Sequence, residues 1–231
     1  MPRVIHILDH LETPEPDAMR VHLAARGLQI DARRMDLGEG PPTFGPESAG
    51  LVLTGGAQMV TDIERLPWMT AELGLVEAAR AMNLPVLGIC LGAQMIAHGL
   101  GGAVGPHPEG HVAYGWHEVT PTAAGAALIP KGLMTLAGNE QGFALPPGAE
   151  ALATGAPFPN QAFRHGNGVL ALQFHPEVTR AILDDWQVML KGNLAKPGAQ
   201  DEAAQDAGML AHDAALKTWL RGMLDRHFAQ G

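Results

Sequence analysis

Apolar segments of strand length alternate with amphipathic segments along most of the chain. The predicted strands are Val4–Leu8, Gln29–Arg33, Leu51–Thr54, Val86–Ile89 and Val169–Phe174. The predicted helices are Asp17–Arg26, which Gly27 ends, Glu72–Met82, and Ala93–Leu100, which Gly101 and Gly102 end. Val119, Leu133–Leu136 and Ala151–Thr154 indicate an antiparallel extension. This alternation predicts an α/β fold whose mostly parallel, open sheet carries helices on both faces.

The C-terminal part of the chain has a different pattern. Lys191–Ala199 contains the turn-forming residues of a linker. A helical pattern follows over about residues 206–228, and its apolar positions are Leu210, Ala214, Leu216, Leu220, Met223 and Leu224. We therefore expect one domain over residues 1–190, with residues 191–231 forming a linker and a helix that packs on it.

The single cysteine, Cys90, lies between Gly88 and Gly92, where a predicted strand meets a predicted helix. A sharp strand-to-helix turn brings backbone and side chains together, so glycine is needed on either side of the turning residue. That residue then projects over the helix N-terminus, which favours a thiolate. A free cysteine is more often a buried apolar residue. A core cysteine does not need flanking glycines, however, so the pattern predicts a nucleophile.

A nucleophilic thiol needs a base, and the base needs a group that orients it. His175 stands at the carboxyl end of the predicted strand Val169–Phe174, the end where active sites of open parallel sheets lie. Glu177 follows two residues later and faces the same side of an extended segment, with Pro176 fixing the backbone between them. Such a pair is also common where a strand ends and a helix begins. Together with a nucleophilic Cys90, the pair predicts that His175 is the base and that Glu177 orients its ring.

The G-x-C-x-G turn at Cys90 and the H-P-E motif at His175–Glu177 together resemble the class I glutamine amidotransferases. The resemblance extends over about residues 51–179 and keeps the order of the family's motifs. It implies the flavodoxin-like fold of that family. It also implies a catalytic triad in which Cys90 is the nucleophile, His175 the acid and base, and Glu177 the residue that orients His175.

The resemblance also implies roles for residues around the triad. Leu51–Ala57 is similar to the family's strand and glycine loop, in which the N–H of Gly56 would form an oxyanion hole with the N–H of Leu91. Gln94 occupies the position of a residue that in relatives helps to hold the substrate glutamine. Gly56 and Leu91 are therefore expected at the oxyanion hole, and Gln94 is expected to bind the substrate.

One loop departs from the family pattern. Relatives usually carry His-Gly-Asp where this chain has Ala137-Gly138-Asn139. Because the family's loop recognises glutamine largely through its backbone, Gly138 and Asn139 are expected to contact the substrate, but the amide that is cleaved is left open. The following segments, Gln141–Glu150 and Gln161–Arg164, are similar to stand-alone members related to the amidotransferase half of GMP synthase.

The expected function is an amide hydrolase that releases ammonia from glutamine without a cofactor or metal. Three alternatives stay open. A γ-glutamyl hydrolase or transferase would use the same triad on another γ-glutamyl amide. A dienelactone-type α/β-hydrolase also has G-x-C-x-G, but its acid precedes its histidine by a long stretch, whereas Glu177 follows His175 almost at once. A non-catalytic binding protein on this fold would not need all three residues.

The composition of the chain excludes some classes of partner. The 231 residues carry a net charge of −9 without a basic block, which argues against nucleic acid and anionic membranes. A single cysteine allows no internal disulfide and fits a reducing cytoplasm, and no apolar run approaches transmembrane length. Residues 191–231 are too short for a synthetase domain, so an ammonia-using synthetase would be a separate protein. His107, His111 and His117 have a spacing that could suggest a metal site, but residues 107–110 have the pattern of a loop. The helical i, i+4 geometry is therefore absent, and no metal site is predicted there.

Overall fold

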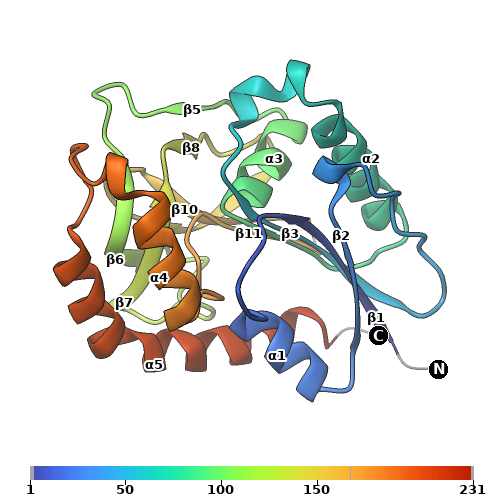
Figure 1. The fold of residues 1–231 in the computed structure, drawn as a ribbon. Helices are drawn as coiled ribbons and strands as arrows, with labels where there is room; N and C mark the ends of the chain where they lie inside the picture. Colours follow the sequence, from blue (N-terminus) through green and yellow to red (C-terminus); the bar gives the residue numbers. More distant parts are fainter. Residues whose placement is uncertain (1–2, 167, 230–231) are drawn as a thin grey trace.

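The computed structural model describes residues 3–166 and 168–229, and it confirms the α/β fold class (Figure 1). Within these residues the main sheet has nine strands in the order β2-β1-β3-β4-β11-β10-β9-β6-β7. The strands from β2 to β11 run parallel, and the remaining neighbours pair antiparallel. The sheet is therefore mixed, with the antiparallel extension expected from the sequence.

The parallel strands are β1 (Val4–His10), β2 (Gln29–Arg33), β3 (Ser48–Gly56), β4 (Val86–Ile89) and β11 (Val169–Leu172). The antiparallel strands are β6 (Ala113–Pro121), β7 (Leu133–Asn139), β9 (Ala149–Thr154) and β10 (Asn160–His165). A separate pair joins β5 (Val104–Pro106) to β8 (Gln141–Phe143). The sequence pattern did not predict β5, β8 or β10.

Helices cover both faces of the sheet (Figure 1). The α-helices are α1 (Ala18–Ala25), α2 (Pro67–Ala81), α3 (Leu91–Gly99), α4 (Arg180–Met189) and α5 (Glu202–His227). Short 3₁₀ turns are η1 (Met35–Leu37), η2 (Val60–Arg65) and η3 (Lys191–Asn193). The helices α2 and α3 lie on one face, and α1 and α5 lie on the other. The sequence pattern did not predict α4.

Alternation along the strands divides the core into two layers. Ile5 of β1 belongs to a buried cluster with Met19 of α1 and Leu220 of α5. Leu51 of β3 belongs to a second cluster, with Ile96 of α3. Because successive side chains of a strand point to opposite faces, one sheet separates the two clusters. The carboxyl ends of the parallel strands are thereby held rigidly between two layers of helices.

The C-terminal helix α5 packs against the sheet, but not with every apolar residue that the pattern suggested. Leu210 is 91% exposed and Ala214 is also exposed, so their expected packing role is wrong. The buried face instead carries Met209, Leu216, Leu220, Met223 and Leu224. The 100° rotation per residue turns Leu210 away from this face, because its neighbour Met209 occupies it.

The segment before α5, predicted as a linker, lies along β6. The N–H of Val112 donates to the carbonyl of Pro197 at 2.8 Å, and the N–H of Gln200 donates to the carbonyl of Tyr114 at 2.9 Å. The side-chain amide of Gln200 also bonds both backbone groups of Trp116. These contacts attach residues 197–200 to the edge of β6. The division of the chain at residue 190 stays a prediction, and residues 1–2 and 230–231 of it lie outside the described residues.

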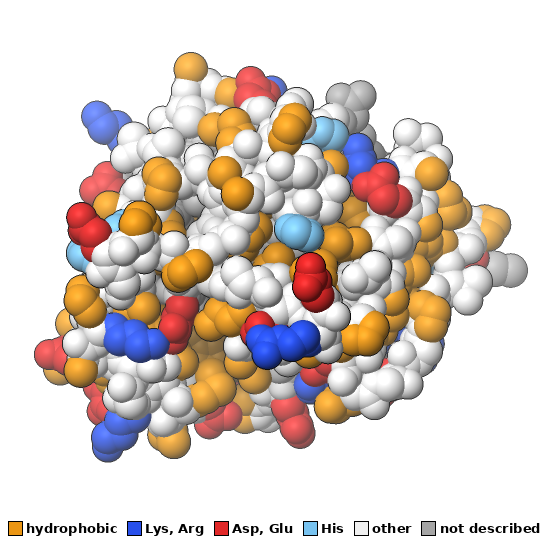
Figure 2. Space-filling view, turned by 90° about the horizontal axis from the view of Figure 1, so that it is seen from above, with side chains coloured by type: hydrophobic (Ala, Val, Ile, Leu, Met, Phe, Trp, Pro, Cys, Tyr) orange, Lys and Arg blue, Asp and Glu red, His pale blue; other side chains and the backbone are white. Residues whose placement is uncertain are grey.

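The upper surface of the molecule is mixed in character. On the face shown in Figure 2, Lys and Arg side chains are scattered among Asp, Glu and apolar side chains. Among the described residues, no helix combines the length and the apolar character needed to cross a membrane.

Two glycines allow α3 to approach the sheet closely. A Cβ on Gly92 would lie 2.2 Å from the carbonyl oxygen of Leu53, and a Cβ on Gly88 would lie 2.9 Å from the backbone of Ala93. Real Cβ atoms do not approach backbone atoms this closely, so these positions exclude larger residues. The first turn of α3 therefore sits against β3 and β4 only because both residues are glycine.

We expect Gly92→Ala to lower the free energy of unfolding by at least about 2 kcal/mol, because the new methyl group displaces the α3 backbone from β3. Urea unfolding followed by circular dichroism measures the change. Gly74→Ala in α2 is the matched control, since nothing lies within 4 Å of its Cβ position, and helix propensity should stabilise it by about 0.5–1 kcal/mol. Equal stability of the Gly92→Ala variant and the wild type would contradict the packing argument.

Candidate active site

Cys90 forms the turn between β4 and α3. Its backbone has φ 49° and ψ −105°, a conformation that non-glycine residues rarely adopt. Hydrogen bonds fix this geometry: the N–H of Cys90 donates to the carbonyl of Leu172 at 2.8 Å, and the carbonyl of Cys90 accepts from the N–H of Gln94 at 2.9 Å. Strain of this kind persists only where the surroundings impose it, and it is concentrated at functional sites.

His175 and Glu177 meet beside this turn. The ring nitrogen Nδ1 of His175 lies 2.7 Å from Oε1 of Glu177, and both side chains are buried. The strand was expected to continue to Phe174, but β11 ends at Leu172 and the pair lies in an irregular segment. Beyond Leu172, the N–H of Gln173 donates to the carbonyl of Gln161 in β10, and the N–H of His175 donates to the carbonyl of Leu136 in β7, both at 2.8 Å.

The surroundings of His175 favour its protonated form. Burial lowers the pKa of this histidine, but the carboxylate of Glu177 and the sulfur of Cys90 outweigh burial and raise the pKa to about 10. An imidazolium next to the sulfur stabilises a thiolate. The arrangement can therefore supply a nucleophile and a proton donor at neutral pH.

The glycine loop at the end of β3 closes one side of the site. A Cβ on Gly55 would lie 2.5 Å from Cε1 of His175, and a Cβ on Gly56 would lie 2.8 Å from Cδ2 of Leu91. Leu91 is the first residue of α3, so its N–H has no acceptor within the helix. The structure thus brings both residues expected at an oxyanion hole beside Cys90.

A buried pair outside the sequence predictions braces this loop. His10 Nδ1 lies 3.0 Å from the carbonyl oxygen of Thr54, and its Nε2 lies 2.8 Å from Oε2 of Glu72. The Cβ position of Gly56 is 2.6 Å from Cβ of His10. The pair therefore fixes the backbone just before the expected oxyanion donor.

The three residues expected at the substrate also lie at the site. Gln94, Gly138 and Asn139 all line the pocket that contains Cys90. The amides of Gln94 and Asn139 both donate to the carbonyl of Gln141, at 2.7 and 2.9 Å. The carbonyl of Gly138 lies 3.9 Å from Sγ of Cys90. The side-chain amides therefore hold the turn between β7 and β8, and Gly138 presents its backbone to the sulfur.

The pocket has a volume of about 260 Å³, and several of its walls were not expected from the sequence. The unexpected lining residues include Tyr114, Glu140, Trp186, Met189, Leu190 and Asn193. Trp186 of α4 packs edge-on against the ring of His175, with centroids 4.6 Å apart and planes at 81°. The Cβ position of Gly138 lies 2.9 Å from the Trp186 ring. The N-cap Thr179 and the helical spacing of Ile182, Leu183, Trp186 and Met189 were the sequence signals that could have found the helix carrying this tryptophan.

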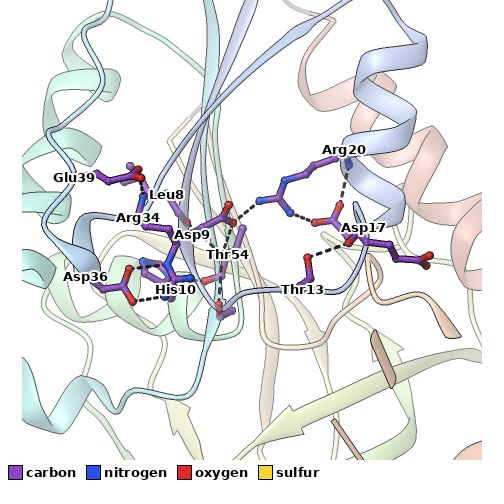
Figure 3. A network of polar contacts seen from close by, with 12 residues as sticks. Leu8, Asp9, His10, Thr13, Asp17, Arg20, Arg34, Asp36, Glu39 and Thr54 are labelled. Carbon is purple, nitrogen blue, oxygen red and sulfur yellow. Dashed lines mark hydrogen bonds and ion pairs between the residues drawn. The ribbon is translucent and has the colours of Figure 1, made fainter. Parts of the chain in front are cut away.

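Figure 3 shows a polar network that includes Asp9, Asp17 and Arg20. The guanidinium of Arg20 bridges the carboxylates of Asp9 and Asp17. Asp17 also caps α1 by accepting from the N–H of Arg20 at 2.8 Å. The next residue, Ala18, donates its N–H to the backbone carbonyl of Glu177 at 2.9 Å. The network thus attaches the segment that carries His175 and Glu177 to α1.

Among the described residues, no group of three or more His, Cys, Asp or Glu side chains is arranged to hold a metal ion. The rings of His107 and His111 pack with centroids 4.8 Å apart. His117 lies on β6, where burial lowers its pKa.

Comparison with known proteins identifies the family. The family model for class I glutamine amidotransferases matches residues 22–185. A glutamine amidotransferase-like protein of Salmonella typhimurium is 31% identical over 183 residues, with 76% of each chain covered. A glutamine amidotransferase from Thermotoga maritima has a similar crystal structure, with a TM-score of 0.87, 26% identity and 99% of each chain covered. The chain belongs to the class I glutamine amidotransferase family.

The chain is also similar to part of a larger enzyme. The glutamine-hydrolysing GMP synthase of Thermomicrobium roseum is 37% identical over 139 residues. This match covers 58% of the present chain but only 24% of the synthase. The chain therefore corresponds to about a quarter of that relative.

We expect the stability of an Asp17→Asn variant, relative to the wild type, to increase with pH. Burial raises the pKa of Asp17 from 3.8 to about 6, with Arg20 opposing and Glu177 adding to the shift. The folded protein therefore holds this proton more tightly than the unfolded chain, so ionisation destabilises the wild type as pH rises through about 4 to 6. Asparagine keeps a capping side chain and does not titrate.

Urea unfolding at about pH 4 and about pH 7 measures this difference. Relative to the wild type, the variant should gain up to about 3 kcal/mol between the two conditions. A difference that is the same at both pH values would show that Asp17 does not hold a proton in the folded protein.

Proposed function

We propose that this protein hydrolyses the side-chain amide of glutamine through a triad of Cys90, His175 and Glu177. One observation carries the proposal: a strained cysteine faces a pocket together with a buried histidine whose Nδ1 is bonded to a glutamate at 2.7 Å. Membership of the amidotransferase family supports the choice of an amide substrate.

In the first half of the reaction, the thiolate of Cys90 attacks the amide carbon and forms a tetrahedral intermediate. The N–H groups of Gly56 and Leu91 stabilise the negative oxygen of this intermediate. The imidazolium of His175 then gives its proton to the amide nitrogen. The carbon–nitrogen bond breaks, ammonia leaves, and a thioester remains on Cys90.

In the second half, neutral His175 takes a proton from water as the water attacks the thioester. A second tetrahedral intermediate forms at the same N–H groups and collapses, releasing glutamate and restoring the thiolate and the imidazolium. Glu177 keeps the ring oriented and stabilises its positive charge in both halves. The edge of Trp186 limits the movement of the same ring.

We further propose that the ammonia passes to a synthetase. Part of the chain is similar to about a quarter of a GMP synthase that is named as glutamine-hydrolysing, which supports a synthetase as the acceptor of the ammonia. Because the nucleophile must stay a free thiol, the reducing cytoplasm is the proposed location.

A γ-glutamyl amide of another amine is the second candidate substrate. Asn139 lines the pocket at a position where the family pattern differs, which favours this candidate. Purified protein offered glutamine and a panel of γ-glutamyl amides separates the two. Faster release of glutamate with an amine than with ammonia would select the second candidate.

Replacement of Cys90 by alanine should lower turnover by at least about 10³-fold, because it removes the nucleophile. Glutamate release measures turnover, and Gly74→Ala, far from the pocket lining, is the control. A glutamine-directed electrophile should label the wild type once, at Cys90, and leave the variant unlabelled. Undiminished hydrolysis by Cys90→Ala would end the proposal.

Replacement of Glu177 by glutamine should separate its role from that of His175. Glutamine retains a polar contact but no longer stabilises the imidazolium, so turnover should fall by about 10² to 10⁴-fold. Labelling of Cys90 should persist in part, whereas His175→Ala should impair both turnover and labelling. If Glu177→Gln resists labelling as completely as Cys90→Ala, then Glu177 does more than orient the histidine.

A further inference from the structure

The pocket around Cys90 is poor in charged side chains, and this restricts what it can recognise. Apart from His175, the described residues that line it include one charged side chain, that of Glu140. The remaining lining side chains are apolar, amide, hydroxyl or thiol groups, or glycine. Neither lysine nor arginine is among these lining residues. A positively charged group of a ligand therefore finds a counter-ion in the lining, at Glu140.

The carboxylate of Glu140 is held in a defined position at the pocket wall. Its Oε1 accepts from the hydroxyl of Tyr114 at 2.5 Å, and its Oε2 accepts from Nζ of Lys196 at 2.8 Å. Burial would raise the pKa of Glu140, but these two donors outweigh burial and lower it, so the side chain is ionised at neutral pH. Each carboxylate oxygen can accept a second hydrogen bond.

Glu140 is also within reach of a substrate bound at Cys90. It follows Gly138 by two residues, and the Gly138 carbonyl lies 3.9 Å from Sγ of Cys90. Two residues span at most about 7 Å of backbone. Its side chain is 26% exposed, so a small ligand can contact it.

We propose that Glu140 is a specificity-determining residue that binds the α-ammonium group of the substrate, so that the pocket selects amino-acid amides. This inference rests on the proposed hydrolysis. It identifies the substrate by the end that carries the amino group, opposite the amide that is cleaved. Glutamine and γ-glutamyl amides both carry this ammonium group, separated from the scissile amide by a short aliphatic chain. Lys196 uses one of its three N–H donors on Glu140, and the ammonium group of the ligand adds a second cation to the same carboxylate.

The test compares glutamine with the monoamide of glutaric acid, which has the same amide and carboxylate but lacks the amino group. The wild type should prefer glutamine in kcat/KM. Glu140→Gln should reduce kcat/KM for glutamine about 10- to 100-fold, mainly through KM, because a charged hydrogen bond is lost from the bound substrate. Activity on the monoamide should change by less than about threefold. Glu150→Gln, which removes an exposed carboxylate paired with Arg164, is the matched control.

An equal loss on both substrates would indicate a structural role for Glu140 and overturn the inference. Unchanged preference for glutamine in Glu140→Gln would do the same. If the wild type hydrolyses neither compound, the proposed function fails. Titration calorimetry of glutamine binding then tests the role of Glu140 without turnover. Glutamine should bind Cys90→Ala protein about 10- to 100-fold more tightly than the Cys90→Ala/Glu140→Gln double variant. Equal affinities, or no binding to either, would overturn the inference independently of catalysis.

Discussion

The close approach of α3 to the sheet is the constraint on which the rest of the site depends. Gly92 lies against the backbone of β3 and Gly88 lies against the first turn of α3, with no room for a Cβ at either position. This contact forces the chain to turn within one residue, and that residue, Cys90, takes a positive φ. A conformation of this kind costs about 1–3 kcal/mol, which the surrounding packing offsets. The close packing of α3 on the sheet therefore accounts both for the backbone strain at Cys90 and for the position of its sulfur at the pocket.

The charges of the site depend on a second set of contacts, which surround the strained turn. A buried histidine would normally lose its proton, but His175 lies between a carboxylate and a sulfur that both favour the charged ring. The backbone of Glu177 is tied to α1, whose capping residue Asp17 is held by Arg20. The position of His175 and Glu177 is therefore supported from the first helix of the chain, far from Cys90 in sequence.

The sequence patterns located the parallel strands and the triad residues because each depends on local signals. β4 matches its predicted bounds, since a short apolar run ends at a glycine-flanked turn. The bounds of α2 and β11 differ from the prediction, since the helix begins earlier, at Pro67, and the strand ends earlier, at Leu172. The roles of the triad residues stay predictions, although the structure places all three together.

The other residues that line the pocket could not be predicted from such local sequence signals. Trp186 reaches His175 from α4, whose apolar residues have helical spacing, but that spacing does not show what the tryptophan contacts. Glu140, Tyr114 and Lys196 come from three separate segments, and only the folding of residues 191–200 along β6 brings them together. Such a set of residues has no characteristic spacing by which a sequence pattern could identify it.

The central claim is that the strained Cys90 carries the acyl group during amide hydrolysis. Rapid acid quenching of the wild type during turnover of glutamine, followed by peptide mass spectrometry, tests it most directly. A glutamyl adduct on the peptide that contains Cys90, removed by hydroxylamine as a thioester would be, is the predicted result. Continued production of glutamate and ammonia with no adduct at any time point, under quenching fast enough to capture one turnover, would contradict the account.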